Sequence, residues 1–145
     1  MSVLQNTESV VSVRNSRRLG ERLGTAGAVM GAAFIIAVGA GYLLAPQAMA
    51  PGFGFTDWPH GEANGFLNVK GVRDVVSGLI LLALLAAGQR RAVGVATLTV
   101  ALIPTGDMLT ILLRHGSTAT ALSVHGLTAA LVAASGALLL RRESR

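Results

Sequence analysis

The sequence predicts an all-α protein, an integral membrane four-helix bundle with N- and C-termini cytoplasmic. Hydrophobic residues make up 52% of the 145 residues and charged residues only 13%, whereas soluble domains are roughly a quarter charged. Four apolar runs are each close to the roughly 20 residues that a helix needs to cross a bilayer; they are about 25–45, 66–88, 92–113 and 119–140. Basic residues gather in alternate segments between these runs, which is typical of membrane topology.

Composition also excludes several classes of protein. The chain has no cysteine, which removes disulfides, thiolate nucleophiles and cysteine-based metal centres. The formal charge of +5 does not indicate nucleic-acid binding, because the basic residues form short clusters between apolar runs rather than a face with aromatic residues. The expected partner of the surface is the lipid bilayer, and the expected location is the cell membrane, with several passes.

Residues 1–24 are polar and then basic, and we expect them to form a cytoplasmic tail before the first span. A cleaved twin-arginine export signal is the alternative for this region. The apolar run 25–45 argues against it, because its 21 residues exceed the roughly 7–15 of a signal core.

Small residues recur at a spacing of four in the first span, at Gly27 and Gly31 and again at Ala33, Ala37 and Gly41. This spacing lets another helix approach closely. We expect the approaching helix to belong to the same chain, and a homodimer face is the alternative.

The connection 46–65 is long and carries three of the four prolines and the only tryptophan, Trp58. Loops of this length are often functional. Phe53, Phe55 and Trp58 would either anchor the loop at the membrane interface or form a lid over a cavity.

The remaining connections set the expected orientation. Residues 89–91 form a basic turn, residues 114–118 turn the chain into the last span, and residues 141–145 form a second basic tail. The positive-inside rule then places both termini and the 89–91 turn in the cytoplasm.

Three ionisable residues, Asp74, Asp107 and His125, lie 14 or 15 residues from the cytoplasmic ends of three different predicted spans. With a rise of about 1.5 Å per residue, each is about 21–23 Å above the cytoplasmic boundary of a core about 30 Å thick. Ionisable groups rarely face lipid. The sequence therefore predicts that these side chains turn inward and form one polar layer in the outer part of the membrane.

A break is expected in the third span at Pro104, because proline cannot donate a hydrogen bond to the carbonyl of Val100. Gly106 loosens the next turn, and Asp107 follows directly. Broken backbone inside a membrane bundle often faces a cavity or ligand, although proline kinks also occur in ordinary spans.

Two interpretations of the polar layer stay open. In the structural one, Lys70 pairs with Asp74, four residues away on the same helix face, Arg73 pairs with Asp107, and His125 donates a hydrogen bond. In the functional one, the candidate catalytic residues are Asp74, Asp107, His125 and Arg73, with the aspartates and His125 exchanging protons and the cations stabilising a negative oxygen.

The candidate ligand-binding residues are Lys70, Asn68, Trp58 and Tyr42. No metal and no cofactor are expected. No pair among Asp74, Asp107 and His125 has the short helical spacing of a strong metal motif, and the neighbouring cations would repel a metal ion.

The run FLNVKGVRD at 66–74, the pair Gly78–Leu79, the run PTGD at 104–107 and the pair His125–Gly126 resemble the integral membrane family called domain of unknown function 4267. The resemblance covers most of residues 25–140. The architecture is also similar to the DoxX-like group of small four-helix membrane proteins. Some DoxX-like proteins are associated with quinone-linked sulfur oxidation or with redox and oxidative-stress proteins, which implies a hydrophobic small molecule in the bundle.

The leading expectation is a membrane-embedded protein that binds a small lipophilic molecule in a polar pocket near the outer face. It would transform this molecule, if at all, by acid–base chemistry such as isomerisation, cyclisation or epoxide opening. The chief alternative is a non-enzymatic subunit or partner of a redox or transport complex, with a structural charged layer. Proton-coupled transport by a homo-oligomer is the third interpretation.

Overall fold

The structure is a computed structural model that describes residues 2–141, with side chains for residue 15 and residues 18–141. These residues form helices and connections without a β-strand. The long helices are α1 (Ser2–Leu44), α3 (Gly65–Ala86), α4 (Arg90–Val100), α5 (Leu102–Leu113) and α7 (Leu127–Leu140). The short ones are α2 (Pro46–Met49), η1 (Ala50–Phe53), η2 (Gly61–Asn64), α6 (Thr118–Thr120) and η3 (Ala121–Gly126).

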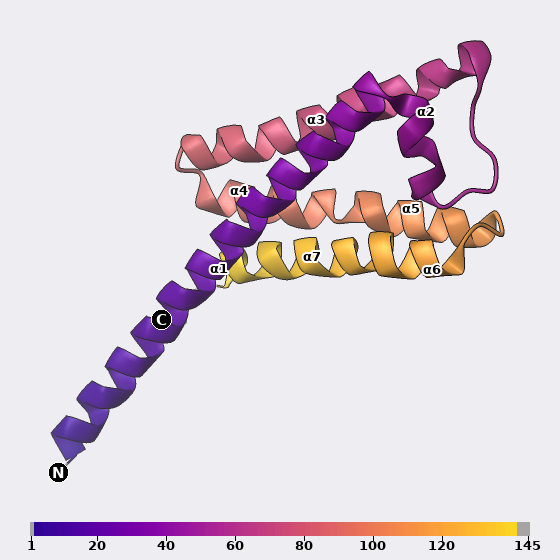
Figure 1. The fold of residues 1–145 in the computed structure, drawn as a ribbon. Helices are drawn as coiled ribbons and strands as arrows, with labels where there is room; N and C mark the ends of the chain where they lie inside the picture. Colours follow the sequence, from indigo (N-terminus) through magenta and orange to yellow (C-terminus); the bar gives the residue numbers. More distant parts are fainter. Residues whose placement is uncertain (1, 142–145) are drawn as a thin grey trace.

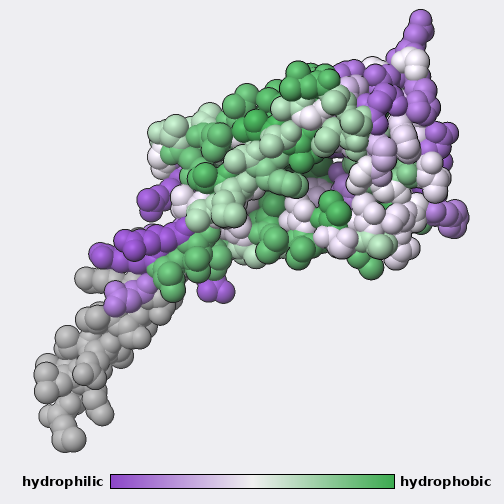
Figure 2. Space-filling view, in the orientation of Figure 1, coloured by the Kyte–Doolittle hydropathy of each residue, from purple (hydrophilic) through white to green (hydrophobic). Residues whose placement is uncertain are grey.

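Three helical stretches are long and apolar enough to cross a membrane, namely Arg18–Leu44, Arg90–Leu113 and Thr118–Leu140. Large apolar side chains stay exposed on the outside of the bundle; Leu131 on α7, for example, is 60% exposed. In Figure 2 hydrophobic residues cover the middle of the molecule, and hydrophilic residues gather at its two ends. These features are those of a membrane protein.

Helix α1 is longer than the predicted first span and continues through residues 2–24. Figure 1 shows this part projecting beyond the other helices. The sequence predicts only a polar tail for residues 1–24, because they lack an apolar period long enough to pack. The packed part of α1 begins by Gly24, which is buried and where a Cβ atom would lie 3.0 Å from Leu139 of α7.

Helix α1 packs closely against α3 through glycines. A Cβ atom placed on Gly39 would lie 2.7 Å from the carbonyl oxygen of Gly71, and one on Gly78 would lie 2.7 Å from the carbonyl oxygen of Ala32. Both distances are shorter than real Cβ contacts. Glycine at these positions therefore lets the two backbones touch.

The part of α1 around Gly27 contacts α7 instead of α3. A Cβ atom on Gly27 would lie 2.1 Å from Oγ of Ser135, whereas one on Gly31 would have only Val132, at 3.9 Å. Helix α1 therefore leaves α7 after Gly27 and crosses the bundle diagonally toward α3 (Figure 1). The prediction that small residues of α1 pack within the chain is confirmed at Gly27, while Ala33 and Ala37 are exposed.

The third apolar run is broken as predicted. Helix α4 ends at Val100 and α5 begins at Leu102, just before Pro104. The pyrrolidine ring has no N–H for the carbonyl of Val100 and clashes with it in a regular helix. The interruption lies at Ala101, six residues before Asp107.

The connection 46–65 folds back over the end of the bundle at which α1 ends and α3 begins (Figure 1). Pro46 opens α2 at the first helical position, where a missing N–H costs nothing. Gly54 has φ +115°, a conformation that favours glycine, and its carbonyl oxygen accepts a hydrogen bond from the backbone N–H of Ser117 at 2.8 Å. This bond fixes Phe53, the preceding residue, against the last helical run.

Candidate functional site

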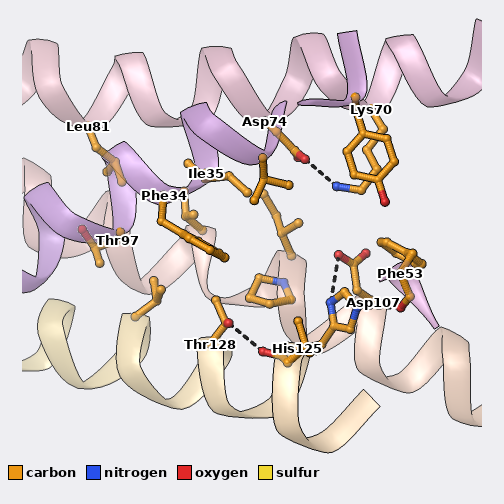
Figure 3. A pocket seen from close by; sticks show the side chains of 18 of the residues that line it. Phe34, Ile35, Phe53, Lys70, Asp74, Leu81, Thr97, Asp107, His125 and Thr128 are labelled. Carbon is orange, nitrogen blue, oxygen red and sulfur yellow. Dashed lines mark hydrogen bonds and ion pairs between the residues drawn. The ribbon is translucent and has the colours of Figure 1, made fainter. Parts of the chain in front are cut away.

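A cavity of about 250 Å³ lies between the helices. Its walls are mostly apolar and come from α1, α3, α4, α5, η3 and α7, while Met49, Gly52 and Phe53 of the connection line it as well. Figure 3 shows that its labelled charged residues gather at one end, beside Phe53. The cavity is thus a largely apolar chamber with a polar end.

The first pair at the polar end is Lys70 and Asp74, four residues apart on α3, whose side chains form a salt bridge. The predicted pairing of these residues is confirmed. The ammonium group of Lys70 also lies 4.8 Å from the ring centroid of Tyr42 and 5.4 Å from that of Phe53. Ring faces at such distances attract a cation, so they hold Lys70 at the cavity wall.

The second pair is Asp107 on α5 and His125 on η3. Nδ1 of His125 lies 3.7 Å from Oδ2 of Asp107, and Nε2 lies 2.9 Å from the carbonyl oxygen of Phe53. A carbonyl oxygen only accepts hydrogen bonds, so Nε2 carries a hydrogen and donates it. The ring of Phe53 packs edge-on against the imidazole, with centroids 4.8 Å apart, and these contacts fix its orientation.

Nδ1 of His125 faces the carboxyl group of Asp107. A neutral imidazole that donates through Nε2 has an acceptor at Nδ1, and this atom lies 3.7 Å from Oδ2 of Asp107. The two groups can exchange a proton once they come within hydrogen-bond distance.

Irregular backbone positions His125. This residue lies on η3, which is a π-helical turn between α6 and α7. Single π-turns inside α-helices are frequent at functional sites. Asp107 lies inside the regular helix α5, six residues after the interruption at Ala101.

The family model described as Domain of unknown function (DUF4267) matches residues 32–139. The chain belongs to this family. The first predicted resemblance is thereby confirmed, and the matched region contains both charged pairs, the break at Ala101 and the connection 46–65. No curated protein and no solved structure matches the chain, and the similarity to DoxX-like proteins stays a prediction.

The structure of this DUF4267 protein brings five of the predicted site residues to the cavity. Tyr42, Lys70, Asp74, Asp107 and His125 all line it. They come from α1, α3, α5 and η3, four segments that are far apart in the sequence. Their meeting matches the inward layer that the sequence predicts.

Arg73, Asn68 and Trp58 do not line the cavity. Arg73 is exposed, because it lies about 100° around α3 from Asp74, and the expected contact of Arg73 with Asp107 is wrong, since Asp107 contacts His125. Nδ2 of Asn68 donates to the carbonyl oxygen of Tyr42 at 3.2 Å. Nε1 of Trp58 donates to Oε1 of Gln47 at 2.9 Å, so Trp58 holds the connection together.

Sequence reasoning missed several cavity residues. Phe34 lies in the uniformly apolar first span, and Thr97 lies in the third span, which has only a few polar residues. Met49 lies in the connection 46–65, where no motif distinguishes it. All three line the cavity. Among these residues, only Thr97 had a feature that could have indicated the cavity, namely a hydroxyl group inside an apolar run. The sequence predicts Phe53 only as an interface anchor or a lid residue. In the structure its carbonyl oxygen also accepts a hydrogen bond from His125.

The cavity is not sealed. Phe34 and Val124 line it and yet keep 53% and 43% of their surfaces exposed. They lie on α1 and η3, beyond the point where α1 leaves α7. In Figure 2 the face crossed by α1 is hollowed beside this helix. The cavity therefore opens on the side of the bundle, between helices, rather than at one of its ends.

Among the described side chains, no group of three or more histidine, aspartate or glutamate residues is arranged to hold a metal ion. Asp107 and His125 face each other with Lys70 at the same cavity end (Figure 3). The arrangement therefore offers proton exchange between a carboxyl and an imidazole, beside a fixed ammonium group.

Proposed function

We propose that this DUF4267 protein crosses the cell membrane four times, with both termini in the cytoplasm. The four crossings are α1 from about residue 25, α3, the α4–α5 run and the α6–η3–α7 run. The three charges of α3 all lie in its outer half, and the following stretch, residues 75–86, is without charge. Basic residues flank the inner ends of the helices, which supports this orientation.

Reporter fusions at positions 58 and 90 test the topology. We expect an exported reporter to be active at position 58 and a cytoplasmic reporter to be active at position 90. Finding both positions on one side of the membrane would contradict the four-span arrangement.

We further propose that the cavity binds a small lipophilic molecule. The single observation that carries this proposal is the apolar chamber with two charged pairs at one end. Its volume of about 250 Å³ is slightly below the 300–1,000 Å³ of typical ligand pockets, which favours a slender ligand. Apolar walls would hold the body of the molecule, and the charged end would hold an oxygenated head group.

The second pair would then act as the acid–base group. In an isomerisation, the Asp107–His125 pair would take a proton from a carbon next to a carbonyl and return a proton to another carbon, without net oxidation. Lys70 would donate a hydrogen bond to the carbonyl oxygen and stabilise the enolate. Cyclisation or epoxide opening needs the same proton donor and acceptor.

Mass spectrometry of the gently purified protein tests the binding step. We expect a defined hydrophobic molecule to co-purify with the wild type. Lys70→Met should release most of it, because the oxygenated head group would lose its hydrogen-bond donor. A stoichiometric partner protein in place of a small molecule would instead support the alternative of a subunit of a larger complex.

Asp107→Asn tests the acid–base step, since asparagine keeps the shape but cannot exchange a proton. We expect conversion of the co-purified molecule to stop while the thermal unfolding midpoint changes little. Asp57→Asn is the matched control, because the side chain of Asp57 is 90% exposed and lies outside the cavity; its Oδ1 accepts from the backbone N–H of Trp58 at 2.8 Å, a bond that the amide oxygen of asparagine can keep. Full conversion by Asp107→Asn would remove this residue from the chemistry.

A further inference from the structure

Thr97 carries a buried hydroxyl group that has no hydrogen-bond partner within the described part of the chain. The residue is only 1% exposed. A buried polar group without a partner lowers the stability of the folded protein. A bound molecule that supplies the partner would remove this cost.

Other hydroxyl side chains in these helices show what Thr97 lacks. Thr99 donates to the carbonyl oxygen of Val95 at 3.1 Å, and Thr128 donates to that of Val124 at 2.6 Å. Each satisfies its hydroxyl within its own helix, four residues back. Thr97 makes no such bond to Val93, and its hydroxyl stays available to something else.

Thr97 lines the same cavity as the charged pairs. Figure 3 shows it beside Leu81, at the end opposite Asp107 and His125. Ten residues of the α4–α5 run separate Thr97 from Asp107, which corresponds to about 15 Å along the helix axis. The cavity therefore has two polar positions, one at each end of an apolar passage.

A water molecule is a poor partner for this hydroxyl. A buried water is held by two to four polar groups, and Leu81, the labelled residue beside Thr97 in Figure 3, has a hydrocarbon side chain. A polar atom carried by a largely apolar ligand would not need further partners from the protein.

We propose that the ligand is an elongated lipid with two oxygen functions, a head group at the charged pairs and a second hydroxyl or carbonyl oxygen about 15 Å away, which bonds to Thr97. This inference rests on the proposed function, because it names the class of molecule that the same cavity takes. The hydroxyl of Thr97 selects among lipophilic molecules by their far end. The charged pairs select by the head group.

Binding of paired probes tests the inference. The probes are alkyl methyl ketones with an extended length of about 15 Å, either with or without a hydroxyl group at the far end. We expect the wild type, in nanodiscs, to bind the hydroxy ketone about tenfold more tightly than the plain ketone, as one hydrogen bond to an unpaired buried group predicts. Thr97→Val should abolish this preference, so that the two ketones bind with about equal affinity.

Two controls separate selection from damage. Thr99→Val removes an exposed hydroxyl that already has a partner, and it should keep the tenfold preference. Thr97→Val should unfold at the same temperature as the wild type or higher, because it removes an unpaired buried polar group. A lower unfolding temperature would show that the hydroxyl has a structural partner, and it would overturn the inference.

The outcomes also distinguish this inference from the proposed function. If the wild type binds both ketones equally, or if Thr97→Val keeps the preference, the role of Thr97 is wrong while the cavity still binds lipophilic ketones. If neither ketone binds to the wild type, both the role of Thr97 and the proposed ketone-type head group are wrong.

Discussion

Neutralising Lys70 tests whether the first charged pair stabilises the fold. Lys70→Met would leave the carboxylate of Asp74, whose side chain is 6% exposed, buried without its cation. Removing one partner of a buried ion pair typically costs 3–5 kcal/mol. The side chain of Lys70 is 19% exposed, so the pair is not fully buried and we expect the lower end, about 3 kcal/mol.

The reverse change should cost less. Asp74→Leu leaves the ammonium group of Lys70, which keeps the ring faces of Tyr42 and Phe53, contacts worth about 0.5–2 kcal/mol. We therefore expect a loss of about 2 kcal/mol. The double variant Lys70→Met with Asp74→Leu has neither charge and should lie within about 1 kcal/mol of the wild type, since apolar replacements of buried ion pairs are often neutral or stabilising.

Reversible unfolding in mixed detergent micelles measures these free energies as a double-mutant cycle. Arg73→Met is the control, because Arg73 is the exposed neighbour on the same helix, and it should change stability by less than about 0.5 kcal/mol. The reasoning would be refuted if Lys70→Met cost less than about 1 kcal/mol, or if the double variant lost the sum of the two single losses.

Two further predictions concern the packing and loop contacts. Gly27→Ala should destabilise the protein by about 1–3 kcal/mol, because the new methyl group would lie 2.1 Å from Oγ of Ser135; Ser135→Gly in the same chain should recover most of this loss in a thermal unfolding assay. Gly54→Ala should cost about 1–3 kcal/mol, because Gly54 has φ +115° and a Cβ atom there would lie 3.1 Å from Thr120. An unchanged unfolding midpoint in either single variant would contradict the corresponding contact.

The helices and the inward layer could be predicted because both depend on regular spacing. Apolar runs of the length of a bilayer predict helices, and equal counts from the helix ends bring Asp107 and His125 to the same depth. The break at Pro104 follows from the covalent structure of proline. Such features are local, or they follow from a rise per residue that is the same in every helix.

The contacts that depend on rotation and on the connection could not be predicted. The partner of Arg73 depends on which side of α3 faces the bundle. Helix α1 decides this by packing Gly39 against Gly71 and the backbone of Ala32 against Gly78. The carbonyl of Phe53 reaches His125 only because Gly54 bonds to Ser117, 63 positions along the sequence. No short pattern in the sequence records such a contact.

The diagonal path of α1 has a consequence for how occupancy is measured. In the proposed arrangement the cavity opens toward hydrocarbon, so its contents exchange with the bilayer rather than with water. The concentration that governs binding is then the mole fraction of the ligand among the lipids. At low occupancy, doubling the lipid at constant protein and total ligand should halve the bound fraction, and diluting the sample with buffer should change it little.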